Sequence, residues 1–296
     1  MNHSTHISLT ANIATKVAAY LGLYKIRLSV LVVFSAILGY LIAAETIEWL
    51  KLVSLCIGGF LVTGASNGFN QILEKDYDKL MTRTKNRPLP LEKISPTEAF
   101  VFCSISGILG IIILWHFLNP LSGWLGILAL FMYVALYTPS KRISSISVVI
   151  GAFPGAIPPM LGWVAAKGYF DLEAGLLFAL QFFWQFPHFW AIAWKANNDY
   201  KKAGFKMLPL KGLKNRSTAF LILLSSLTLL PIGFLPYYFG FCNEIGLVTL
   251  MILGVLMVIP SLFLFLKMKD KYALQTMFAS FLYLLIAQII LFIDKV

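Results

Sequence analysis

The sequence predicts an all-α integral membrane protein in which about nine transmembrane helices form a bundle. Hydrophobic residues make up 59% of the 296 residues and charged residues 12%, whereas soluble domains carry about 25% charged residues. A spanning helix needs about 20 mostly apolar residues. Such stretches occur at 28–44, 50–73, 98–117, 121–138, 146–166, 171–194, 217–239, 244–266 and 272–293. A β-barrel is disfavoured because residues 121–136 are continuously apolar and do not alternate.

The N-terminal region differs from the rest of the chain. Residues 1–27 contain a mild amphipathic pattern but no basic start, apolar run or cleavage site typical of a signal peptide. We therefore expect a cytoplasmic interfacial segment over 1–27 and a single transmembrane domain over 28–296. Cys56, Cys103 and Cys242 occur singly, which indicates neither a disulfide framework nor a zinc site.

The basic residues predict the orientation of the chain. If the N-terminus is cytoplasmic, only Lys51, Lys167 and Lys295 fall in outer connections, and the remaining basic residues face the cytoplasm. The net charge of +11 is then mainly a topology signal, so we expect no nucleic-acid partner. The first 24 residues contain one basic residue, Lys16, which argues against a mitochondrial transit peptide and favours a bacterial inner membrane.

Two long polar connections, residues 74–96 and 195–216, both lie on the predicted cytoplasmic face. Loops of this length in compact proteins are commonly functional. At the first connection Asn70, Glu74 and Asp78 follow each other at spacings of four, which places three oxygen ligands along one helix stripe. Magnesium prefers such ligands.

Arg83 and Arg87 follow this stripe, and guanidinium groups match phosphate geometry. The combination indicates a metal-bound diphosphate. The alternative is a solvated helix end whose charges neutralise one another. The direct continuation of Asn70 and Glu74 from an apolar span favours the functional interpretation, because polar groups in membrane helices are costly.

The second connection is preceded by Pro187 and His188, and Lys195 and Asp199 follow His188 at spacings of seven and four. These spacings predict one helix face that carries a base, a cation and a carboxylate. Asp199 is a candidate for a second metal-bridging carboxylate, and His188 is either an iron ligand or a hydrogen-bonded packing residue. Tyr137 and Lys141, at the inner end of the fourth span, are either phosphate contacts or interfacial anchors.

At these residues the sequence resembles the UbiA-type membrane prenyltransferases, and in particular their haem-farnesylating branch. The resemblance covers residues 25–295 and the nine-helix layout of the family. It rests on the segments 70–89, 137–142, 155–163 and 184–209. Two residues depart from the family pattern: Ser147, where an asparagine is expected after the turn at Lys141 and Arg142, and Ala152, where a glycine is expected.

The resemblance implies that a farnesyl group passes from farnesyl diphosphate to a vinyl group of haem b with addition of water, giving haem O for terminal oxidases. It implies Mg2+ as cofactor, membrane lipid as the surroundings, haem-oxidase assembly proteins as candidate partners, and a cytoplasm-facing active site. The implied metal ligands and catalytic residues are Asn70, Glu74, Asp78 and Asp199, with Asp76 as a weaker metal ligand. The implied diphosphate-binding residues are Arg83, Arg87, Tyr137, Lys141 and Lys195, and His188 is a candidate haem-binding residue.

Three alternatives remain at this point. A related prenyltransferase would act on an aromatic acceptor, and product analysis would distinguish it. A secondary transporter would place its polar site at the membrane midplane, whereas the polar residues here gather at the inner end. A structural haem-binding protein would bind haem without needing magnesium or Glu74.

Overall fold

The computed structural model describes residues 15–296, apart from the side chain of Lys211. Within these residues the chain forms helices and turns, with one isolated bridge between Cys242 and Lys295. The elements are α2 (Ile26–Ala43), α3 (Trp49–Leu73), α4 (Lys75–Asp78), α5 (Pro96–Phe117), α6 (Pro120–Phe131), the π-helix η1 (Met132–Tyr137), α7 (Thr138–Ile143), α8 (Ser147–Lys167), α9 (Leu172–Lys195), α10 (Asn197–Lys202), α11 (Pro209–Gly212), α12 (Arg216–Leu227), α13 (Leu229–Tyr238), α14 (Glu244–Lys267) and α15 (Asp270–Ile293).

Nine helical segments in the described part of the chain are long and apolar enough to span a membrane. Seven are single helices, and two are composite: α6, η1 and α7 form one span, and α12 and α13 form another. The predicted fold class and the nine predicted spans are confirmed. Their observed ends differ from the predicted ends by a few residues, as helix ends commonly do.

Local sequence explains where several of the spans begin. The Ser95 side chain accepts a hydrogen bond from the backbone N–H of Glu98, and the Glu98 side chain accepts one from the backbone N–H of Ser95, which forms a capping box before α5. Asn119, Asp171 and Asn215 each accept a backbone hydrogen bond from the third residue that follows. These caps satisfy N–H groups that helix starts leave without partners.

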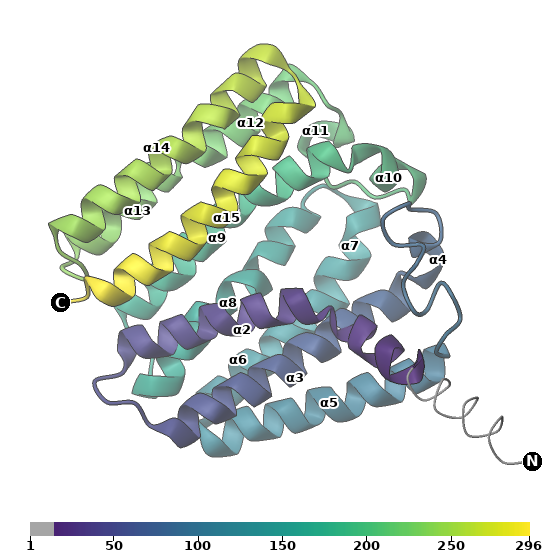
Figure 1. Cartoon of the computed structure of the whole chain (residues 1–296), viewed down its shortest axis with the longest axis horizontal. Coiled ribbons are helices and arrows are strands. Elements are labelled where there is room, and N and C mark those ends of the chain that lie inside the picture. The colour runs from purple at the N-terminus through teal and green to yellow at the C-terminus, as the bar shows by residue number, and fades with distance from the viewer. Residues whose placement is uncertain (1–14) are drawn as a thin grey trace, which may run out of the picture.

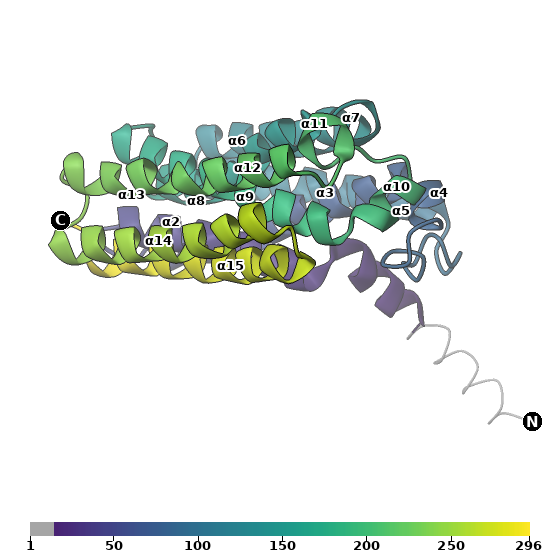
Figure 2. The same ribbon diagram turned by 90° about the horizontal axis from the view of Figure 1, so that it is seen from above.

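The helices are arranged in a broad bundle (Figures 1 and 2). The C-terminal helices α12 to α15 lie on one side, α3 and α5 lie on the other, and α2, α8 and α9 lie between them. Helices α2 and α8 approach closely because Gly39 faces the Pro159 carbonyl and Gly162 faces the Ala36 carbonyl, where a Cβ atom would collide. Small residues allow such approaches between membrane helices.

The connections 74–95 and 196–215 lie at the same end of the bundle, which we call the polar end (Figures 1 and 2). Residues 15–24 are helical and pack there, with Ala19 and Leu23 buried against Leu89, Ile94 and Ala99. This part of the predicted interfacial segment therefore packs on the 74–95 connection and α5. Residues 1–14 lie outside the described residues.

Candidate active site

The first polar motif begins at the end of α3. Asn70 is in the last turn of α3, and Glu74 leaves helical geometry with φ −100° and ψ 7° before α4 begins. The prediction of one continuous helix through Asp78 is therefore wrong. A hydrogen bond of 2.8 Å from the Asp78 N–H to the Glu74 carbonyl nevertheless keeps the helical spacing. Asn70, Glu74 and Asp78 are all buried, with exposed fractions of 1%, 5% and 0%.

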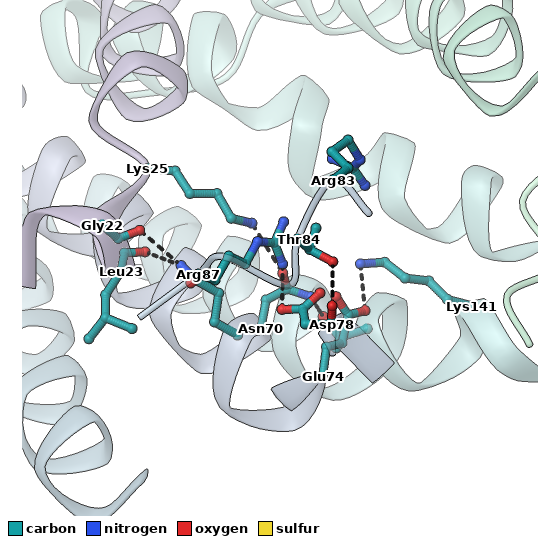
Figure 3. Close-up of polar contacts among 12 residues, drawn as sticks. Gly22, Leu23, Lys25, Asn70, Glu74, Asp78, Arg83, Thr84, Arg87 and Lys141 are labelled. Carbon is teal, nitrogen blue, oxygen red and sulfur yellow. Dashed lines mark hydrogen bonds and ion pairs between the residues drawn. The ribbon is translucent and has the colours of Figure 1, made fainter. Parts of the chain in front are cut away.

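Three cationic side chains converge on these three residues (Figure 3). Lys141 Nζ lies 2.8 Å from Glu74 Oε1, and Arg87 Nη1 lies 2.7 Å from Asp78 Oδ2. Lys25 Nζ donates to Asn70 Oδ1 at 3.1 Å. We call these six residues the ionic cluster. It contains three basic groups and two carboxylates, and this excess of basic side chains suits an anion.

Burial and neighbouring charges shift the pKa values of two groups in the ionic cluster. Burial, together with the nearby charges of Arg87 and Lys141, holds the pKa of Lys25 well below its usual value. An anion bound among these groups would stabilise the charged form of Lys25. Burial raises the pKa of the Asp78 carboxyl, although the adjacent Arg87 opposes this change.

Tyr137 and Lys141 extend the ionic cluster to the fourth span. Lys141 Nζ lies 4.4 Å from the centroid of the Tyr137 ring, a cation–π contact. Thr138 Oγ1 accepts a hydrogen bond of 3.2 Å from Asn70 Nδ2. The structure thus brings Tyr137 and Lys141 to the residues of the first motif.

The donor set of the ionic cluster fits a divalent cation in one respect. Asp78 Oδ1 is buried and has no hydrogen-bond partner among residues 15–296, which is unusual for a buried carboxylate oxygen. Its amide and carboxylate neighbours are oxygen ligands of the type that magnesium prefers. No group of three His, Cys, Asp or Glu side chains within the described residues is arranged to hold a metal by itself. A bound metal would therefore need ligands from a substrate or water as well.

The second polar motif meets the first through Asp199. Its Oδ2 accepts a hydrogen bond of 3.1 Å from the backbone N–H of Arg83, and Lys202 lies 3.5 Å from Oδ1. Burial raises the pKa of Asp199, but the backbone hydrogen bonds from Arg83 and Thr82 outweigh it and leave the pKa below its usual value. Asp199 therefore stays ionised beside the 82–84 segment, where Thr84 donates to the Asp78 carbonyl at 3.0 Å.

Other predicted site residues lie apart from the ionic cluster. The Arg83 guanidinium contacts the Tyr200 hydroxyl at 3.5 Å and points away from the cluster (Figure 3). The Asp76 side chain is exposed on α4. Lys195 is also exposed, and it interacts electrostatically with Asp270 at the start of α15.

The prediction that His188, Lys195 and Asp199 share one helix face is wrong. Helix α9 continues through Pro187 and ends at Lys195, and Asp199 lies on the separate helix α10. His188 is buried instead, with a hydrogen bond of 2.7 Å between its Nδ1 and Ser280 Oγ, and its ring stacks on Trp184 with centroids 4.5 Å apart.

His188 and Trp184 line a cavity of about 320 Å³ between α2, α3, α6, η1, α8, α9 and α15. Most of its lining is apolar, and Tyr137 lines it as well. Because Tyr137 also contacts Lys141, the ionic cluster lies at one end of this cavity. The arrangement would accommodate a molecule with an anionic head and a long apolar tail.

Sequence reasoning missed two residues of this site. Lys25 and Thr138 both contact Asn70. Lys25 lies just before the first span, and in the sequence it is one of many basic residues that flank membrane helices on the cytoplasmic side. In the structure its backbone is left-handed, with φ 47°, and forms a sharp turn. Thr138 carries no charge, so nothing in the local sequence distinguishes it from other threonines in membrane helices.

Comparison with known proteins adds independent evidence. The sequence profile of the UbiA prenyltransferase family matches residues 32–285. The chain is 45% identical over 286 residues to the protoheme IX farnesyltransferase of Cytophaga hutchinsonii, covering 96% of this chain and 99% of that protein. It is also 45% identical over 276 residues to the protoheme IX farnesyltransferase of Christiangramia forsetii, covering 92% and 91%.

Solved structures share the fold. A structure of digeranylgeranylglyceryl phosphate synthase aligns with a TM-score of 0.79 at 20% identity, covering 94% of this chain and 98% of that chain. A UbiA homolog from Archaeoglobus fulgidus bound to DMAPP and Mg2+ aligns with a TM-score of 0.66 at 13% identity, covering 92% and 99%. Since the family profile covers most of the chain and the relatives align over nearly their whole lengths, the chain belongs to the UbiA prenyltransferase family.

Proposed function

We propose that this prenyltransferase transfers a farnesyl group from farnesyl diphosphate to a vinyl group of haem b with addition of water, giving haem O for terminal oxidases. The observation that carries the proposal is the ionic cluster at the end of an apolar cavity, in a chain that is 45% identical to two protoheme IX farnesyltransferases. The cluster suits the diphosphate and the cavity suits the isoprenoid chain.

The cationic side chains account for departure of the diphosphate. Negative charge grows on the diphosphate as its bond to the farnesyl group breaks, and fixed positive charges in a water-poor site stabilise that change. We assign diphosphate binding to Arg87, Lys141 and Tyr137, and add Lys25 because it lies in the same cluster. Arg83 and Lys195 are outer candidates that would have to turn toward the substrate, because their side chains are exposed in this structure.

We also propose Mg2+ as cofactor, with Asn70, Glu74, Asp78 and Asp199 as ligands and Asp76 as a weaker candidate. The buried Oδ1 of Asp78, which has no hydrogen-bond partner within residues 15–296, supports this assignment. When bound, Mg2+ would supply further positive charge for the leaving diphosphate. Glu74 and Asp78 form ion pairs with Lys141 and Arg87. The same two carboxylates would therefore position both the basic side chains and the metal ion.

The acceptor half of the proposed site is the wall of the cavity that contains His188. The imidazole is held by Ser280 and by its stacking on Trp184, so it is rigidly placed. We propose His188 as a haem-binding residue. The apolar surroundings would protect the allylic cation from premature hydrolysis.

The proposed setting is a bacterial inner membrane, with the N-terminus and the polar end in the cytoplasm. The excess of basic residues in the connections of the polar end supports this orientation. We treat residues 28–296 as a single transmembrane prenyltransferase domain. Both substrates are lipophilic, which suits a site within the bilayer, and haem-oxidase assembly proteins are proposed partners in receiving the product.

The test is to incubate membranes that contain the protein with haem b, farnesyl diphosphate and Mg2+, and then to identify the extracted haem by chromatography and mass. We expect a farnesylated haem that carries an added hydroxyl group, and we expect a chelator to abolish its formation. If haem b is unchanged while an aromatic acceptor is prenylated, the haem assignment is wrong and the alternative acceptor class is correct. Haem binding without any prenylated product would contradict the enzyme assignment.

A further inference from the structure

A patch of polar side chains interrupts the apolar wall of the cavity. Ser35 on α2, Gln181 and Gln185 on α9, and Gln288 on α15 all line it. Each is more than nine-tenths buried, with exposed fractions of 4%, 6%, 2% and 3%. Polar groups within a membrane helix are costly and are by default functional candidates.

The amides of Gln185 and Gln288 have used both of their N–H groups, and Gln181 Nε2 donates to the Gly155 carbonyl at 3.1 Å. Gln288 Nε2 donates to Ser35 Oγ at 2.7 Å and to Gln181 Oε1 at 2.8 Å. Gln185 Nε2 donates to the carbonyls of Ala152 at 2.9 Å and Gln181 at 3.2 Å. Both hydrogens of each of these two amides are therefore bound to the protein.

The amide oxygens of Gln185 and Gln288 remain available. Neither Oε1 atom receives a hydrogen bond from any residue between 15 and 296. Gly155 makes room for the Gln185 oxygen, because a Cβ atom at this position would collide with it. These two side chains thus offer acceptor oxygens and no free amide hydrogen, so a ligand that binds to them must donate hydrogen bonds.

The proposed reaction requires such a ligand. The terminal vinyl carbon of haem forms a bond to the first carbon of the farnesyl chain as the bond from that carbon to the diphosphate breaks. A cation remains on the vinyl carbon next to the porphyrin ring. The oxygen of a water molecule must then bond to this carbon, and the proton that the oxygen loses passes to the departed diphosphate.

We propose that Gln185 and Gln288 bind the water molecule that adds to the haem side chain; the inference rests on the proposed function. A water molecule that donates both hydrogens to amide oxygens keeps its lone pairs for the attack. The rest of the cavity lining is mostly apolar and offers few sites for other water molecules, so hydration would be directed to one place. In this role both glutamines act on the second step and leave the departure of the diphosphate unaffected.

The test compares the products of Gln185→Met with those of the unmodified protein in isotopically labelled water. Methionine has nearly the shape of glutamine but offers no amide oxygen. Without a bound water the cation loses a proton instead, which gives a farnesylated haem that is lighter by one water. We expect the ratio of this product to labelled hydroxylated haem to rise by about tenfold, the effect of losing one good hydrogen bond in an apolar site.

Three further variants complete the test. Gln288→Met should give the same shift and serves if Gln185→Met does not accumulate. Gln185→Glu keeps an acceptor oxygen and should retain the hydroxylated product. Ser66→Ala is the matched control. Ser66 also lines the cavity, but among the residues that the structure describes its hydroxyl bonds only to its own helix, to the Val62 carbonyl at 2.9 Å. Its product ratio should be unchanged.

Two results have different meanings. If both methionine variants accumulate and make less product but with an unchanged hydroxylated fraction, the glutamines only join the helices and the inference is wrong. If the unmodified protein farnesylates no haem at all, the proposed function itself is wrong, and this outcome is visible without any variant.

Discussion

Among single residues, the buried ion pair between Lys141 and Glu74 links stability to the proposed chemistry. Both side chains are less than one-tenth exposed. Replacement of Lys141 by methionine would leave the Glu74 carboxylate buried without its partner, which costs about 3 kcal/mol in unfolding free energy. Thermal unfolding of the detergent-solubilised protein would measure this loss.

A double variant separates the two roles of Lys141. Lys141→Met combined with Glu74→Gln removes both charges, so we expect most of the stability to return while farnesyl transfer stays lost. If Lys141→Met is as stable as the unmodified protein, the buried ion pair does not contribute to the free energy of unfolding as we expect.

Asp78 and Asp199 are both expected to act in the chemistry, and Asp78 also pairs with Arg87 inside the protein. Asp78→Ala or Asp199→Ala should lower transfer by about 100-fold or more, because each removes an electrostatic contact of the diphosphate site. The amount of Asp199→Ala protein in the membrane should stay close to normal, which immunoblotting of membranes would check. Asp78→Ala should accumulate less, because it also leaves Arg87 without its buried partner. Near-normal turnover in either variant would exclude that residue from the site.

His188 should affect haem more than farnesyl diphosphate. His188→Ala removes a side chain that lines the cavity. The ionic cluster, which we propose binds the diphosphate, does not include His188. We expect the apparent KM for haem b to rise by about tenfold, corresponding to roughly 1.4 kcal/mol, with little change for farnesyl diphosphate. Steady-state kinetics with each substrate varied in turn would measure both. An unchanged apparent affinity for haem would contradict the assignment.

At the scale of elements, the close contact between α2 and α8 supports one wall of the cavity. Both helices contribute lining residues, and Gly162 lies against the Ala36 carbonyl. Gly162→Ala should force the helices apart and cost about 2 kcal/mol. Gly175→Ala on α9 is the matched control, since its Cβ would meet nothing within 4 Å. Unfolding temperatures should fall for the first variant and stay the same or rise for the second.

At the scale of the whole molecule, the distribution of basic residues predicts which side of the membrane the site faces. Alkaline phosphatase, which is active only outside the bacterial cytoplasm, should be inactive when fused after Lys93 and active when fused after Val296. The physical reason is the preference of basic connections for the cytoplasmic side. The opposite pattern of activity would place the ionic cluster on the outer side.

The sequence alone determined the parts of this protein that depend on local composition. Continuous apolar stretches predict the nine spans because the bilayer requires each span to satisfy its own backbone hydrogen bonds. The charged segment from Asn70 to Arg87 could be recognised as a candidate site for the same reason, since polar groups that continue from a membrane helix are conspicuous.

Only the tertiary structure decided which of these residues meet. Lys25 contacts Asn70 although 45 positions separate them, whereas Lys195, the last residue of α9, is exposed and lies apart from the ionic cluster. The polar patch in the cavity wall, formed by Ser35, Gln181, Gln185 and Gln288, could not be recognised in the sequence either, because Gln181 and Gln288 are 107 positions apart. Helix packing sets such contacts through the rotation and close approach of whole helices, and the spacing of residues within one helix carries no information about either.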